Sequence, residues 1–271
     1  MRPPQRHPLY VQMFPDYEPR LTAVLAQLAG YRVAERIDWR ARVEAWLSNF
    51  EGLRDQRLAM TMLERLRVVS EAEIIEGCRS LLETIQASLP RKARLLHFAH
   101  ETSGGLLVRL LEKDLRVRSF AVLRQADFTN LGALGKLRDG DAVVVWDRFN
   151  GTGRQLARIV KLYGTAFAGS GRKIGALHFA YIAGHRPKKV LPPGAVLHRW
   201  IEDIPVVSSE EKDMCDRYAE AAGATETNRK YETGALLTFA DNPPNNAPLV
   251  LRAPGSDGWS PLLARKETAR P

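Results

Sequence analysis

The sequence predicts an α/β protein with an open, mainly parallel sheet, a helical N-terminal extension and a C-terminal cap. From Arg94 onward, short apolar runs alternate with segments of helical spacing, which is typical of parallel strands connected by helices. The first ninety residues instead carry helical spacing with glycine or proline between the helices. We therefore expect a helical extension over 1–90, an α/β core over 91–205 and a cap over 206–271.

Composition limits the function classes. The chain has 271 residues and 45% apolar content, which permits a substantial core and excludes wholesale disorder. Its net charge of +9 favours anionic ligands or a nucleic-acid partner, and equally fits a well-solvated basic surface. Cys78 and Cys215 are far apart and support neither a disulfide framework nor a cysteine metal site. No long apolar stretch or leader pattern occurs, so we expect a cytoplasmic protein.

The extension is expected to contain four amphipathic helices. Their apolar residues recur at helical spacing within 21–28, 39–50, 58–66 and 74–85. The second of these helices carries an aromatic stripe made of Trp39, Trp46 and Phe50. Such a stripe can stack on nucleic-acid bases, but at helical spacing it is far more typical of a buried core.

The stretch Asp141–Val160 organises the predicted core. Four apolar residues, 143–146, form a run typical of a strand buried on both faces, and Asp147 follows where the strand should end. A tight Asn-Gly-Thr-Gly turn comes next, and a helix begins near Arg154. Such a turn offers free backbone amides and the positive end of a helix dipole, which suits a phosphate. An ordinary strand-to-helix turn is the alternative.

Other strands are expected on both sides of this signature. They cover 95–99, 117–123, 173–182, 196–200 and 234–239, and a late helix starts at Ser208. A loop with Thr102, Ser103, Gly104 and Gly105 follows the first of these strands and precedes a helix. In an open parallel sheet, ligands bind at the carboxyl ends of the strands, and both candidate loops fall at such ends.

The signature strand and its turn resemble the ribose-phosphate motif of the type I phosphoribosyltransferase superfamily. The form Asp-x-Phe-x-Gly-Thr-Gly-x-Gln at 147–155 is most similar to the phosphoribosyltransferase-like (PRTase-CE) proteins of bacterial conflict and anti-phage defence systems, including retron-associated ones. The Trp-x-x-x-Phe helix at 46–50 resembles the same proteins, and the segments at 244–248 and 259–265 resemble their Pro-Asn-Asn-x-x-Pro and Trp-x-Pro-Leu-x-x-Arg endings. The resemblance runs from about Trp39 to Arg265 in scattered motifs.

The resemblance implies a sheet of phosphoribosyltransferase type and a set of site residues. Phosphoribosyl pyrophosphate, or a nucleotide with a ribose 5-phosphate, is the implied ligand. Asp147, the candidate catalytic residue, would bind ribose hydroxyls, and the loop of Thr102, Ser103, Gly104 and Gly105 would hold pyrophosphate, with Mg²⁺ as the usual cofactor. The 5-phosphate would lie on Gly151, Thr152, Gly153, Arg154 and Gln155.

One departure from the motif leaves the activity open. Arg148 replaces the second acid, and an arginine facing the ribose would oppose the positive charge that develops during transfer. Three hypotheses therefore remain: a phosphoribosyltransferase, a nucleotide-sensing subunit without turnover that acts with a defence-system partner protein, and a nucleic-acid-binding subunit that uses the basic surface. No membrane partner is expected.

Other motifs carry little weight. His97, His100 and Glu101 lack the His-Glu-x-x-His spacing and do not share one strand face, so we assign no metal ligands. The sequence contains neither a Gly-x-Ser-x-Gly elbow nor a Walker A motif, which disfavours α/β-hydrolase and P-loop functions.

Overall fold

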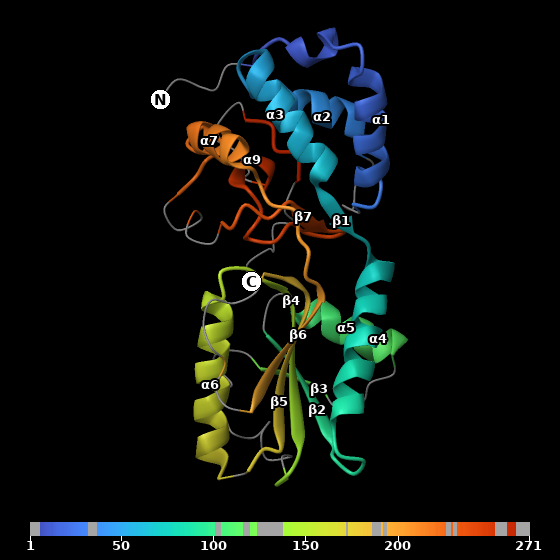
Figure 1. Cartoon of the computed structure of the whole chain (residues 1–271), viewed down its shortest axis with the longest axis vertical. Coiled ribbons are helices and arrows are strands. Elements are labelled where there is room, and N and C mark those ends of the chain that lie inside the picture. Colours follow the sequence, from blue (N-terminus) through green and yellow to red (C-terminus); the bar gives the residue numbers. More distant parts are fainter. Residues whose placement is uncertain are drawn as a thin grey trace. The chain divides into compact units, whose positions relative to one another are not determined.

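The computed structural model divides the chain into two compact units. The structure describes residues 6–31, 37–100, 104–115, 120–123, 138–171, 173–185, 191, 194–225, 229, 232–252 and 259–263. Unit 1 combines the two ends of the chain, Met1–Glu71 and Ile204–Pro271, and unit 2 is the continuous stretch Ala72–Asp203 (Figure 1). The three-part division expected from the sequence stays a prediction.

Unit 2 is built on a five-stranded sheet in which every neighbouring pair is parallel. The strand order is β3-β2-β4-β5-β6. The strands are β2 (Leu95–His100), β3 (Phe120–Leu123), β4 (Ala142–Asn150), β5 (Ala176–Gly184) and β6 (Ala195–Ile201). This arrangement confirms the predicted α/β fold class with an open parallel sheet.

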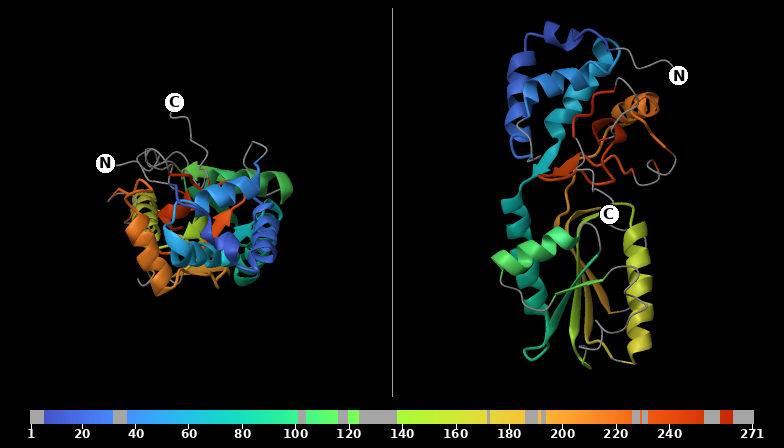
Figure 2. Two further views of the ribbon diagram at one scale, coloured as in Figure 1. Left: turned by 90° about the horizontal axis from the view of Figure 1, so that it is seen from above. Right: turned by 180° about the vertical axis from the view of Figure 1, so that it is seen from behind.

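Helices cover both faces of this sheet. Figures 1 and 2 show α6 (Arg154–Ser170) on one face and α4 (Glu71–Ser88) and α5 (Gly104–Asp114) on the other. Leu156, Ile159 and Tyr163 of α6 form a core with alternate residues of β4, Val143 and Val145. On the opposite face, Gly77 of α4 lies against the Trp200 ring, where an added Cβ would come within 2.6 Å of a ring carbon. The close approach of α4 to the sheet therefore requires glycine at this position.

The strand order contains one point where the direction of chain progress reverses. From β2 the chain moves outward through α5 to β3, and it then returns to β4 on the other side of β2 and continues to β5 and β6. β2 and β4 are therefore adjacent strands whose following helices lie on opposite faces. In open α/β sheets, the crevice at such a switch point is where ligands bind.

Unit 1 combines helices with a small two-stranded parallel sheet. Strand β1 (Arg67–Val69) pairs with β7 (Leu237–Phe239). The helical elements are η1 (Tyr10–Met13), α1 (Tyr17–Leu28), α2 (Trp39–Leu47), α3 (Gly52–Arg65), α7 (Ser209–Tyr218) and α9 (Leu249–Arg252). Ser208 and Glu211 form a capping box that begins α7, because each side chain bonds the other residue's backbone N–H.

The core of unit 1 joins segments distant in sequence. Trp46 is fully buried, and its indole Nε1 donates to the carbonyl oxygen of Val250 at 2.6 Å. Phe50 is buried and makes edge contacts with the rings of Trp46, Tyr218 and Trp259. Core packing of Trp46 and Phe50 confirms the interpretation of the aromatic stripe, whereas Trp39 is only partly buried against this core.

Several element boundaries differ from the sequence prediction. Helix α3 begins at Gly52, where φ is +70°, and not near Leu58. Strand β1 was not predicted, because three residues between two helices give no periodic signal. Of the predicted strand 117–123, residues 117–119 lie outside the described part of the chain. None of the described helices has the length and apolar composition needed to cross a membrane.

Candidate functional site

The turn after β4 has the geometry expected of a phosphate loop. β4 ends at Asn150, residues 151–153 form the turn, and α6 begins at Arg154. Gly153 has a φ of +73°, in the left-handed region that side chains with a Cβ adopt only with strain. The backbone N–H of Ala157 donates to the Gly153 carbonyl oxygen at 2.9 Å, which is the first backbone bond of α6. Glycine at 153 thus allows the chain to turn directly from the strand into the helix.

This turn presents polar groups to solvent. The side chains of Thr152 and Arg154 are exposed. The amides of Gly151, Thr152 and Gly153 make no hydrogen bond to any residue that the structure describes. The Thr152 Oγ1 accepts a long bond, 3.4 Å, from the Arg154 amide. Amides at a helix N-terminus, together with the helix dipole, form an environment that favours an anion.

The second candidate loop belongs to the neighbouring strand. Gly104 and Gly105 are the first two residues of α5, whereas Thr102 and Ser103 lie outside the described residues. β2 ends at His100 and pairs with β4 through Ala99 and Trp146. The N-termini of α5 and α6 therefore follow two adjacent strands at the switch point of the sheet.

The motif acid is buried on the α6 face of the sheet. Asp147 is 1% exposed and lies opposite Tyr181 in the register between β4 and β5. Burial, and secondly the nearby Asp147 carboxylate, raise the pKa of both Tyr163 and Tyr181 well above the usual value for tyrosine. Sequence analysis missed these two tyrosines as neighbours of the acid. The sequence gives little indication of this contact, because Tyr163 continues the apolar face of α6 and Tyr181 lies in the middle of an apolar run.

Arg148 lies on the opposite face from Asp147. Successive side chains of a strand point to opposite faces, so Arg148 shares the face of Trp146, which α4 and α5 cover. Arg148 is 8% exposed, and its backbone N–H donates to Asp147 Oδ1 at 2.7 Å. Beside it, the Trp146 indole donates to Nδ1 of His97 at 3.1 Å. The arginine that replaces the second acid therefore does not share the acid's face.

The carboxyl end of β5 lies close against the turn. The His185 backbone N–H donates to the Asn150 carbonyl oxygen at 2.9 Å, and the Asn150 side-chain amide donates to the His185 carbonyl oxygen at 3.3 Å. Gly184 makes this approach possible, since a Cβ there would lie 2.9 Å from the Asn150 Cβ. Arg199 of β6 donates to the Gly184 carbonyl oxygen at 3.2 Å. The sequence indicated only that the strand ends near Gly184.

Histidines lie on the face of the sheet shared with Trp146. Nδ1 of His178 and Nε2 of His198 are 3.0 Å apart, in a hydrogen bond whose donor depends on the tautomers. Burial lowers the pKa of His97 to about 4, and burial together with the neighbouring His178 lowers that of His198 to about 4. Within the described part of the chain, no group of three histidine, cysteine or acidic residues could hold a metal ion. Because their pKa values are lowered to about 4, the rings of His97 and His198 are neutral at physiological pH.

Comparison with known proteins identifies the family. The sequence matches the PRTase-CE family over residues 43–191, more than half of the chain. The chain belongs to the PRTase-CE family. The match includes β2, β4, both helix N-termini that follow them and Asp147, and it confirms the resemblance to phosphoribosyltransferase-like proteins. No curated protein matches the chain.

Solved structures similar to this PRTase-CE protein include several phosphoribosyltransferases. A hypothetical protein from Neisseria gonorrhoeae with bound ppGpp is 16% identical, with 57% of this chain and 94% of that chain covered and a TM-score of 0.35. A purine phosphoribosyltransferase from Pyrococcus horikoshii is 17% identical over 52% of this chain and 97% of its own, with a TM-score of 0.33. Xanthine-guanine-hypoxanthine phosphoribosyltransferase from Helicobacter pylori is 14% identical, covers 50% and 89%, and has a TM-score of 0.35.

Proposed function

We propose that this PRTase-CE protein binds phosphoribosyl pyrophosphate, or a nucleotide with a ribose 5-phosphate, at the carboxyl ends of β2 and β4. The observation that carries the proposal is the turn 151–153, in which Thr152 is exposed. Its amides bond to none of the described residues, and it lies at the switch point of a parallel sheet. The PRTase-CE match over residues 43–191 includes this turn, which supports the proposal.

In this proposal the turn holds the 5-phosphate. The amides of Gly151, Thr152 and Gly153 donate to phosphate oxygens, as do the first amides of α6, including that of Gln155. The Thr152 hydroxyl adds a donor, because the bond it accepts from the Arg154 amide leaves its own proton available. The exposed Arg154 guanidinium adds positive charge beside the turn.

Pyrophosphate would lie at the neighbouring helix N-terminus. The amides of Gly104 and Gly105 begin α5 and are suited to an anion by the same dipole argument. Thr102 and Ser103 complete this loop in the proposal. Mg²⁺ commonly binds through one or two carboxylates together with substrate phosphates. Asp147 is buried on the α6 face, so in this proposal the diphosphate oxygens would be the main ligands of the ion, which would supply charge neutralisation of the diphosphate.

Asp147 would accept hydrogen bonds from ribose hydroxyls. Its side chain is 1% exposed, so direct contact with ribose requires a rearrangement around the end of β4. Arg148 lies on the face that α5 covers, on the side of the proposed pyrophosphate. There a guanidinium would stabilise the departing diphosphate and would not face the ribose carbon that gains positive charge. Turnover is therefore compatible with Arg148, and we propose a phosphoribosyltransferase of a bacterial anti-phage defence system.

A nucleotide-sensing or nucleic-acid-binding subunit without turnover is the second candidate. Helix α6 contains no aspartate or glutamate, and it exposes Arg154, Arg158 and Lys161 along one side that starts at the turn. Positive charge that continues from a phosphate site along a helix suits a longer polyanion, such as the backbone of a nucleic acid. This basic side of α6 is the observation that favours the second candidate.

One set of measurements separates these candidates. Isothermal calorimetry and thermal shift with phosphoribosyl pyrophosphate and nucleoside monophosphates, with and without Mg²⁺, test the site. Pyrophosphate release in the presence of purine and pyrimidine bases identifies a transferase, and saturable binding without release identifies a sensor. Steep salt dependence of RNA or DNA binding that Lys161→Glu reduces identifies the polyanion site on α6. If none of these ligands binds, the proposed phosphate site is wrong.

A further inference from the structure

Exposed apolar side chains gather in one region of unit 1. Within the described residues, five large hydrophobic side chains are exposed, and three of them, Tyr10, Met13 and Leu53, belong to η1 and the first turn of α3. These two elements pack against each other: the Val11 amide donates to the buried Gln56 side chain at 3.1 Å. Apolar groups that remain exposed together often mark a site of protein–protein contact.

Helix α3 has a clear inner face and an unusual outer face. Its inner residues, buried in unit 1, are Asp55, Gln56, Ala59, Met60, Met62 and Leu63. The outer face carries Leu53, Arg54, Arg57, Leu58 and Thr61, which helical geometry places on one continuous side. Leu58 is partly buried and also packs against the core of unit 1, whereas Leu53, Arg54 and Arg57 are exposed and are not required by that core. An exposed leucine beside two exposed arginines fits a surface that a partner covers.

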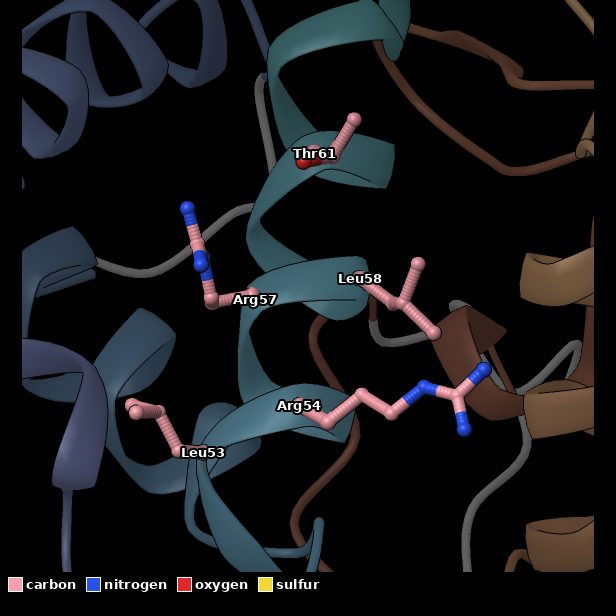
Figure 3. A pocket seen from close by; sticks show the side chains of 5 residues that line it. All are labelled: Leu53, Arg54, Arg57, Leu58 and Thr61. Carbon is pink, nitrogen blue, oxygen red and sulfur yellow. The ribbon is translucent and has the colours of Figure 1, made fainter.

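This outer face is hollowed. A pocket of about 490 Å³ is lined by the five outer residues of α3. Figure 3 shows Leu53 and Arg57 splayed to one side of the helix and Arg54 and Leu58 to the other, with Thr61 one turn further along. The volume lies within the range of about 300–1,000 Å³ that is usual for ligand sites. It is large enough to receive apolar side chains of a peptide.

The charges at the rim of the pocket are both positive. The Arg57 guanidinium lies over the Phe14 ring, 4.3 Å from its centroid, and pairs with no carboxylate that the structure describes. Arg54 has one distant acidic neighbour, Glu210, at 3.9 Å, and both side chains are more than half exposed. Exposed pairs of this kind are weak, so a partner carboxylate can displace Glu210 at little cost. The contact with Phe14 favours this position of the Arg57 guanidinium and leaves its N–H groups without a carboxylate partner among the described residues.

We propose that the α3 pocket docks an acidic amphipathic segment of a partner protein. Apolar side chains of that segment fill the space between Leu53 and Leu58, and its aspartate or glutamate side chains pair with Arg54 and Arg57. Arginine suits this role because its planar fork bonds a carboxylate through two N–H groups. The proposal is independent of the phosphate site, since it concerns a surface of unit 1 alone.

The lining favours a peptide over a nucleic acid. Bases stack on exposed aromatic rings, whereas the apolar side chains that line this pocket are the aliphatic Leu53 and Leu58. The Phe14 ring beside the pocket is already covered by Arg57. A second copy of this chain is less suitable, because the charge of +9 makes two such surfaces repel each other. An acidic segment satisfies both the leucines and the arginines.

The test uses the full-length protein and a defined probe. The probe is a short fluorescein-labelled peptide of glutamate and leucine with leucines at helical spacing, and the matched control peptide has lysine in place of glutamate. We expect saturable binding of the glutamate peptide only. Arg54→Glu with Arg57→Glu should weaken binding at least about tenfold, and Leu53→Ala should weaken it about threefold or more. Leu53 is 40% exposed, so its truncation leaves the fold intact.

A charge-matched control is available in unit 2. Arg91→Glu with Lys92→Glu changes the net charge by the same amount in an exposed turn, and this variant should bind like the wild type. If the control variant weakened binding of the glutamate peptide equally, the peptide would be attracted by net charge alone, and the proposal would be overturned. So would the absence of peptide binding, displacement of the peptide by a single-stranded oligonucleotide at equal concentration, or self-association that the Arg54 and Arg57 variant abolishes.

Discussion

Each of the two units is stabilised by a different kind of internal contact. In unit 1 the contacts join the two ends of the chain: Trp46 bonds Val250, and Asn49 exchanges two hydrogen bonds with Ser260. In unit 2 a continuous stretch folds into a ladder of parallel strands, each connected to a strand nearby in sequence. Unit 2 thus carries the candidate phosphate site on a regular sheet, whereas unit 1 depends on side-chain packing and hydrogen bonds between the two ends of the chain.

The units also differ in how they handle ionisable groups. Unit 2 contains five of the six histidines of the chain, and unit 1 contains only His7. Two buried polar side chains in the core of unit 1 are satisfied by hydrogen bonds: the Gln56 amide donates to the carbonyl oxygens of Pro8 and Phe50, and Asp55 accepts from Arg217 and Tyr218. This contrast predicts that point mutation at the aromatic core breaks unit 1, while mild acid weakens unit 2.

The largest effect is expected from Trp46→Ala. Truncation of a buried tryptophan costs about 3–5 kcal/mol of unfolding free energy, and here it also leaves the Val250 carbonyl without its indole donor. Trp39→Ala should cost less, because this ring is only partly buried and meets Tyr31 edge-on. Urea unfolding measures the loss of unfolding free energy in each of the two variants. Hydrogen exchange should show lost protection in unit 1 first. An unchanged urea midpoint for Trp46→Ala would contradict the core assignment.

The second prediction concerns pH and unit 2. Burial lowers the pKa of His97 to about 4, whereas a histidine in the unfolded chain has a pKa near 6.5. The folded protein favours the neutral His97 ring. The contribution of this ring to the free energy of unfolding is therefore complete above about pH 6.5 and is lost as the pH falls towards 4. The full loss is about 3 kcal/mol for His97. The lowered pKa values of His178, His185 and His198 act in the same direction.

Urea unfolding at neutral pH and near pH 5 checks this pH effect. His97→Asn keeps an acceptor for the Trp146 indole and removes the titrating ring, so its stability should depend less on pH than that of the wild type. Hydrogen exchange, corrected for the intrinsic rate at each pH, should locate the loss in unit 2. Equal pH dependence of the variant and the wild type would exclude His97 as the cause.

The regularity of unit 2 explains what could be predicted from sequence. Apolar runs such as 143–146 and the glycine turn after them predict a strand, a turn and a helix, because these signals are local. Burial of Trp46 followed from helical spacing for the same reason. The pairing of β1 with β7, and of Asn49 with Ser260, depends on contacts between distant segments that no periodicity records. The proximity of Tyr163 and Tyr181 to Asp147 likewise depends on register, which the sequence alone does not fix.

Gly153→Val should separate strain from ligand binding. Gly153 has a φ of +73°, so a β-branched residue there costs about 1–3 kcal/mol and crowds the phosphate. Gly140→Val is the matched control: Gly140 has a φ of +85° at the start of β4, at the opposite end of the strand from the turn. We expect similar stability losses for both variants, and calorimetry should show that only Gly153→Val abolishes binding of phosphoribosyl pyrophosphate. Loss of binding in both would indicate general damage to the sheet.

The smallest expected change in affinity comes from Asp147, which lies on the opposite face of β4 from Arg148. Asp147→Asn keeps the side-chain shape but removes the charge that ribose hydroxyls would contact. A hydrogen bond to a charged group contributes about 1.5–3 kcal/mol, so affinity for phosphoribosyl pyrophosphate should fall roughly tenfold or more. Unchanged affinity with a lower melting temperature would instead make Asp147 a structural acid held beside Tyr163 and Tyr181.

Arg148 then decides between transfer and sensing. If its guanidinium stabilises the departing diphosphate from the α5 face, Arg148→Asp should abolish pyrophosphate release and leave binding of ribose 5-phosphate unchanged, since Gly151–Gly153 are untouched. If it obstructs turnover as a replaced second acid, the same variant should release more pyrophosphate than the wild type. Arg148→Met controls for burial, because it removes the charge without adding an acid to a site that is 8% exposed. Reduced release in both variants, with the melting temperature kept, would assign the charge of Arg148 to the chemistry of unit 2.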